Sequence, residues 1–107
     1  MLYEIRTYTP AANRAQQLKE RFRDHTLAFF NRHGIEVVGC WEPVERPEEL
    51  VYMVCFESES AREVAWSSFA SDPDWRRVKQ ESEVDGPLLE SQSAVVLTAT
   101  DFSPVLR

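Results

Sequence analysis

The chain has 107 residues, of which 43% are hydrophobic and 28% charged, with a formal net charge of −6 and an isoelectric point near 4.9. This length predicts one domain over residues 1–107. An acidic chain without clustered lysine and arginine is not expected to bind nucleic acid or anionic lipid. There is no apolar run of about 18 residues that would predict a membrane span. The start Met1–Arg6 lacks the features of a secretion signal, so we predict a cytoplasmic protein.

The first predicted elements are a strand and a long helix. Residues Leu2–Tyr8 alternate between an apolar side and a mixed side, which is the pattern of a strand. After a break, apolar residues recur at helical spacing from Asn13, the expected N-cap, to His33. Gly34 is the expected stop, because glycine readily takes a left-handed conformation. Such a helix spans on the order of 30 Å, enough to cross a four-stranded sheet.

Two strands are predicted next, over Ile35–Pro43 and Leu50–Glu57. The segment Val51–Phe56 is apolar at every position, and continuous apolarity indicates that both faces of a strand are covered. Helices can cover one face. A chain this short cannot cover the other, so the pattern predicts a second subunit.

A second helical stretch and a last strand complete the predicted elements. Ser60–Glu63 reads as a capping box that opens a helix. Asp72 and Pro73 restart this helix as cap and first helical residue, and Asp85–Pro87 ends it. The final β-rich run is Ala94–Ala99.

The order strand, helix, strand, strand, helix, strand predicts an α+β fold of the ferredoxin-like βαββαβ type. Right-handed crossovers put the first and third strands in the centre of a four-stranded antiparallel sheet of order 4-1-3-2, with the helices on one face. Two copies packed sheet to sheet would form a dimeric α/β barrel, so we expect a homodimer.

Five short segments give the chain a resemblance to a known family. They are Tyr3-Glu4-Ile5-Arg6-Thr7-Tyr8, Arg32-His33-Gly34, Val38-Gly39-Cys40-Trp41, Asp72-Pro73-Asp74-Trp75 and Leu88-Leu89-Glu90-Ser91-Gln92. In this order and spacing, nearly the whole chain resembles the NIPSNAP family, within the dimeric α/β-barrel proteins. The resemblance implies a ferredoxin-like fold and a homodimer whose sheets pack face to face, but no agreed set of catalytic residues. Related barrels include cofactor-free monooxygenases, haem-degrading enzymes and small-molecule isomerases, so function must be argued from the site.

His25 is the candidate catalytic residue. It shares a helical stripe with Leu18, Phe22 and Phe29, at steps of four, three and four residues, which predicts that it faces the sheet. An imidazole there would act as an acid or base near neutral pH, or ligate a metal or haem. A buried, hydrogen-bonded structural histidine is the alternative. Because His33 is too far along the helix to share an ion with His25 and no third ligand is evident, we predict no metal site.

The predicted ligand site lies between the helices and the sheet. Its polar anchor is His25, and its walls are aromatic: Trp41, Tyr52, Trp66 and Trp75. Clefts that are mostly apolar with a few polar groups are the usual sites of small ligands, although ordinary core packing is the alternative for each of these aromatic residues. No cofactor is predicted.

Two charges on the predicted central strand need partners. Glu4 and Arg6 lie on its mixed side, and a buried charge is costly unless it is paired. We expect structural ion pairs, with Glu57 or Glu36 of the second subunit as partners.

Three functions stay open from the sequence. The first is a homodimer that binds a small apolar or aromatic ligand. The second is a cofactor-independent monooxygenase or related enzyme with His25 as its base, and the third is a non-enzymatic interaction module. No Ser-His-Asp arrangement is expected, because Ser67, Ser68 and Ser71 lack a signature turn.

Overall fold

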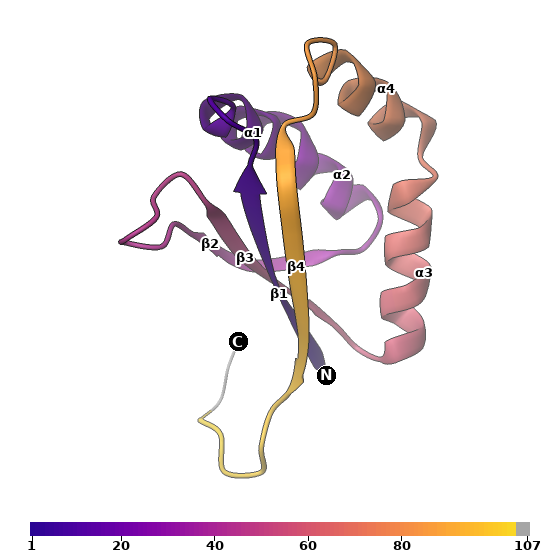
Figure 1. Ribbon diagram of the computed structural model, residues 1–107. Helices are drawn as coiled ribbons and strands as arrows, with labels where there is room; N and C mark the ends of the chain where they lie inside the picture. The colour runs from indigo at the N-terminus through magenta and orange to yellow at the C-terminus, as the bar shows by residue number, and fades with distance from the viewer. Residues whose placement is uncertain (105–107) are drawn as a thin grey trace.

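The protein folds into a four-stranded antiparallel sheet with its helices on one face (Figure 1). The structure is a computed structural model that describes residues 1–104. The strands are β1 (Leu2–Pro10), β2 (Glu36–Trp41), β3 (Leu50–Phe56) and β4 (Leu89–Thr98). The helices are α1 (Ala15–Arg21), η1 (Phe22–Thr26), α2 (Leu27–Arg32), α3 (Glu59–Ala70) and α4 (Pro73–Ser82). The sheet order β2-β3-β1-β4 confirms the predicted ferredoxin-like α+β topology.

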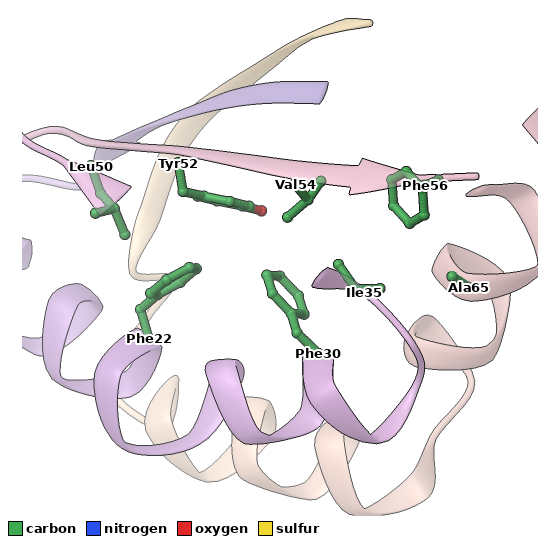
Figure 2. Close-up of a cluster of buried hydrophobic side chains, with 8 residues drawn as sticks. All are labelled: Phe22, Phe30, Ile35, Leu50, Tyr52, Val54, Phe56 and Ala65. Carbon is green, nitrogen blue, oxygen red and sulfur yellow. The ribbon is translucent and has the colours of Figure 1, made fainter. Parts of the chain in front are cut away.

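The hydrophobic core lies between β3 and the long first helix. Alternate residues of β3 point toward the helices and are buried, among them Tyr52 and Val54. They meet Phe22 and Phe30, as Figure 2 shows. Burying side chains of this size supplies on the order of 1.5–3 kcal/mol each, which fixes the long helix on the sheet.

The opposite face of the sheet is uncovered within residues 1–104. Cross-strand partners lie on the same side of a sheet, so the pairing register identifies the members of this face. They include Tyr3, Ile5, Val51, Met53, Val95 and Leu97. The side chain of Val95 is 54% exposed. This apolar surface is called the open face below. It accounts for the observation that Val51–Phe56 is apolar at every position, and not only at alternate ones.

The long first helix is interrupted by the π-helical turn η1. The N–H of Leu27 donates to the carbonyl of Phe22, and Thr26 Oγ1 donates to the carbonyl of Arg21 at 3.3 Å, both across five residues. A π turn holds one residue more than an α turn, so it shifts every later side chain around the helix axis. Thr26 is therefore buried on the inner face, where regular α-helical spacing would place His25.

Several predicted boundaries differ from the structure. The first helix begins at Ala15, because Asn13 has a left-handed backbone (φ 64°). Ser58 caps α3 in place of Ser60, its Oγ accepting from the N–H of Ala61 at 3.1 Å. β4 begins at Leu89, five residues before the predicted Ala94. The prediction missed this first half of the strand because it is polar and exposed and has no pattern of buried residues.

The cap of α4 was predicted correctly. The Asp72 carboxylate accepts from the N–H of Asp74 at 2.8 Å, and Pro73 is the first helical residue. No helix in the described residues is both long enough and apolar enough to cross a bilayer.

Candidate functional site

A buried carboxylate is the centre of the candidate site. Glu4 on β1 points toward the helices and is 0% exposed. It accepts hydrogen bonds from Arg6 Nε at 2.8 Å, Arg62 Nε at 2.8 Å and Trp66 Nε1 at 2.9 Å. Burial by itself raises the pKa of Glu4, but the three hydrogen bonds outweigh burial and hold this pKa below its ordinary value. The carboxylate is therefore ionised at neutral pH.

The guanidinium of Arg6 is held in a fixed orientation. Its Nε donates to Glu4, and its plane lies over the Trp66 ring, 4.1 Å from the ring centroid. Such cation–π stacking is worth about 0.5–2 kcal/mol. Arg6 Nη1 lies 3.4 Å from Gln92 Oε1 on β4, and the side chain is 21% exposed. Glu4, Arg6, Arg62, Trp66 and Gln92 are called the Arg6 cluster below.

Two tyrosine hydroxyls meet beside the Arg6 cluster. The hydroxyls of Tyr8 and Tyr52 are 2.8 Å apart, and their rings pack edge to face at 5.2 Å. Burial raises the pKa of both hydroxyls, while the cations of Arg6 and Arg21 oppose this effect at Tyr8. Both hydroxyls therefore stay protonated near neutral pH, and each can donate or accept a hydrogen bond.

An aromatic network joins these groups to the helices. Phe30 contacts Tyr52 and Trp66, with centroids 5.7 and 5.5 Å apart. Phe69 contacts Trp66 at 6.1 Å and Trp75 at 4.9 Å. The structure thus brings together three of the predicted wall residues, Tyr52, Trp66 and Trp75. Tyr52 is fully buried and therefore supports this wall from within the core.

The helix layer does not cover β4. By register, Gln92, Ala94 and Val96 are the cross-strand neighbours of Tyr8, Arg6 and Glu4, so they lie on the side that faces the helices. All three are nevertheless exposed, and Val96 keeps 42% of its surface accessible. The Arg6 cluster consequently borders an uncovered strip of sheet.

The predicted placement of His25 is wrong. His25 is exposed and lines an open hollow of about 380 Å³ between η1 and α4, together with Glu20, Asp24 and Val78. The π turn explains the error, because it rotates His25 away from the sheet and puts Thr26 in its place. His25 is therefore not placed to anchor a ligand between the helices and the sheet.

Trp41 also lies apart from the aromatic network. It is 52% exposed at the end of the outer strand β2. Its ring lies so close to Gly39 that a Cβ atom there would approach it to 2.7 Å, so a side chain at position 39 would require the exposed Trp41 ring to shift. Trp41 lines a separate hollow of about 630 Å³ with Cys40 and Lys19.

The sequence interpretation gave Glu4 and Arg6 the wrong partners. Glu4 and Arg6 pair with each other, and Glu4 also pairs with Arg62, so neither charge pairs with Glu57 or Glu36. The alternation of β1 showed that both charges share a side with Tyr8. It did not show that this side faces the helices, where Arg62 and Trp66 supply the missing donors.

A second polar cluster joins the ends of three helices. His33 Nδ1 lies 2.5 Å from Ser68 Oγ, and His33 Nε2 lies 2.6 Å from Asp72 Oδ2. Arg32 Nη1 also donates to Asp72, at 2.9 Å. A Ser-His-Asp chain is thus present, contrary to the expectation from sequence. Its aspartate caps α4, and its serine lies inside α3, where backbone N–H groups are already bonded within the helix, so we interpret it as structural.

Among residues 1–104, no group of three or more His, Cys, Asp or Glu side chains is arranged to hold a metal ion.

The fold and the Arg6 cluster define a ferredoxin-like α+β domain with a charged and aromatic site on the helix side of its sheet. The NIPSNAP family model matches residues 3–104. This chain belongs to the NIPSNAP family. None of the curated protein sequences matches it.

Solved structures agree with this assignment. The chain is 25% identical to an uncharacterized NIPSNAP domain protein from Burkholderia xenovorans, over 98% of this chain and 100% of that chain, with a TM-score of 0.82. A NIPSNAP family protein from Agrobacterium tumefaciens is 23% identical, with 97% of each chain covered and a TM-score of 0.83. A candidate antibiotic biosynthesis monooxygenase from Deinococcus radiodurans shares the fold at 12% identity, with 100% of each chain covered and a TM-score of 0.67.

Proposed function

We propose that this NIPSNAP-family chain acts as a homodimer that binds a small ligand with an apolar or aromatic body between its helices and its sheet. The observation that carries the ligand proposal is the Arg6 cluster. It is a fixed and partly exposed guanidinium on an indole, beside an uncovered strip of β4. Binding sites commonly combine apolar walls with a few oriented polar groups.

The open face supports the homodimer. Its side chains Ile5, Met53 and Val95 are apolar, and within residues 1–104 no helix lies over them. Exposed apolar surface of this kind commonly marks an interface. A second copy offers a surface of the same chemistry, and packing the two open faces together would remove both from water.

Replacing Val95 with glutamate is expected to convert the dimer to a monomer. Val95 contributes little to the core of one protomer, so the fold should survive while a buried charge penalises the interface. Sedimentation velocity at micromolar concentration measures the change. The matched control is Val84→Glu, because Val84 is 80% exposed and lies outside the open face. A wild-type protein that sediments as a monomer contradicts the homodimer.

Ligand binding is expected to raise the melting temperature of the wild-type protein with at least one member of a panel of aromatic and acyl metabolites. A ligand at about 100 times its Kd stabilises the folded state by about 2.7 kcal/mol. Trp66→Ala should lose this shift, because it removes the indole that supports Arg6. His25→Ala should keep it, because His25 lies on the outer side of η1.

The opposite result in this assay is also informative. A shift lost in His25→Ala but kept in Trp66→Ala would place the ligand elsewhere and favour the enzyme with His25 as base. An intact dimer with no ligand-induced shift across the panel would contradict the ligand site and favour the interaction module.

A further inference from the structure

We propose that the ligand beside Arg6 is an acid whose flat aromatic or conjugated body bears a carboxylate, with Arg6 as the residue that binds the carboxylate. This inference rests on the proposed function and specifies the chemical class of its ligand. The structure supports it in three ways: the geometry of Arg6, the local charge and the uncovered strip of sheet.

The geometry of Arg6 leaves hydrogen-bond donors available. A guanidinium carries several N–H donors in a planar fork that matches a carboxylate, and here Nε donates to Glu4 at 2.8 Å. Nη1 has a long contact of 3.4 Å to Gln92, which is exposed and can be displaced, and the guanidinium also lies near the Tyr8 hydroxyl. Because Glu4 and the Trp66 ring fix the plane, a carboxylate would meet these donors without a loss of side-chain freedom in Arg6.

The local charge favours an anion. Two guanidinium groups, those of Arg6 and Arg62, converge on the single buried carboxylate of Glu4. Glu59 accepts from the other end of Arg62, but it is more than half exposed and screened by solvent. The nearby Arg21 cation also acts on Tyr8, but Arg21 is itself paired with Glu83 at 2.8 Å and adds no net charge. At Glu4 itself, two cations therefore share one buried anion, an arrangement that favours a second anion although the net charge of the chain is −6.

The uncovered strip of β4 accommodates the body of the ligand. Ala94, the cross-strand neighbour of Arg6, has only a methyl side chain, and Val96 follows on the same side. Trp66 adds an aromatic surface next to the guanidinium. A flat conjugated acid would place its ring on this strip and its carboxylate on Arg6. A neutral hydrocarbon lacks the charge that Arg6 would bind, and inorganic phosphate lacks the apolar body that would cover the strip.

The test compares 2-naphthoate with the neutral 2-naphthamide, which has nearly the same shape. We expect wild-type protein to bind the acid at least about tenfold more tightly than the amide in isothermal titration calorimetry, because the acid forms a charge-assisted pair. Arg6→Gln should remove this preference by weakening only the acid, and Arg6→Lys should keep part of it. Added salt should weaken the acid and not the amide.

Each outcome separates this inference from the proposed function. Equal affinity of the acid and the amide for wild-type protein overturns the inference while the ligand site stands, and this comparison does not depend on whether Arg6→Gln folds. A preference for the acid that persists in a folded Arg6→Gln protein also overturns it, since the carboxylate would then bind elsewhere. No binding of either probe, together with no stabilisation by any metabolite of the panel, removes the ligand site itself.

Discussion

Replacing Glu4 with glutamine is expected to lower the free energy of unfolding at neutral pH by about 2–4 kcal/mol. Glutamine keeps the shape of glutamate but loses the charge, so the guanidinium groups of Arg6 and Arg62 lose their shared partner. Its amide also turns an N–H group toward donors. For a domain of about 100 residues, this loss corresponds to a melting temperature lower by about 10 °C or more.

Thermal and urea unfolding at matched protein concentration measure this effect, because assembly would make apparent stability depend on concentration. The control is Glu59→Gln, which removes a carboxylate that contacts the same Arg62 from the solvent side. An exposed pair of this kind is worth about 0–1 kcal/mol, so the control should unfold close to wild type. Equal unfolding of the two variants would contradict the central role of Glu4.

Acid is expected to destabilise the protein through Asp72. The hydrogen bond from His33, the N–H of Asp74 and the pair with Arg32 lower the pKa of Asp72 from its ordinary 3.8 to about 2. A carboxyl group with a depressed pKa in the folded state stabilises that state fully above its unfolded pKa. This stability is lost as the pH falls from about 4 toward 2. The melting temperature should therefore fall across this range.

Two substitutions separate the roles of Asp72. Asp72→Asn keeps an oxygen that can cap α4 but cannot titrate, so its melting temperature should depend less steeply on pH between 4 and 2 than that of wild type. Asp72→Ala also loses the cap and should melt about 5 °C or more below wild type at neutral pH. Asp74→Asn, at a half-exposed neighbour, is the control. Equal pH slopes for wild type and Asp72→Asn would exclude Asp72 as the titrating group.

The topology could be predicted from the sequence because consecutive elements have different periodicities. The all-apolar run of β3 predicted a central strand, and the order of the elements left one sheet arrangement compatible with right-handed crossovers. The cap at Asp72 and the stop at Gly34, with φ of 74°, depend on local chemistry and were also predicted correctly.

The placement of His25 could not be predicted, because residue spacing does not reveal a π turn. Leu18 and Phe22 fit a continuation through either His25 or Thr26, and regular α-helical spacing selects His25. The extra residue of η1 selects Thr26, which is buried and whose hydroxyl donates to the carbonyl of Arg21.

The Arg6 cluster was missed for a different reason. Alternation in β1 separates two sides, one with Tyr3 and Ile5 and one with Glu4 and Arg6, and the apolar side is ordinarily the one expected against helices. In the structure the charged side faces the helices, because Arg62 and Trp66, 58 and 62 residues further along the chain, donate hydrogen bonds to the Glu4 carboxylate. A pairing over that sequence distance leaves no local pattern.

The solvated character of β4 has a consequence for the dynamics of the chain. The strand is held by a long backbone ladder to β1, yet nearly all of its side chains remain exposed. Detaching it would break hydrogen bonds while exposing little additional apolar surface, so within a protomer its amide protons should exchange with solvent by local opening, before the core unfolds. Association through the open face would bury Val95 and Leu97 and slow that exchange. The exchange rate of the β4 amide protons therefore depends on whether the protein is assembled.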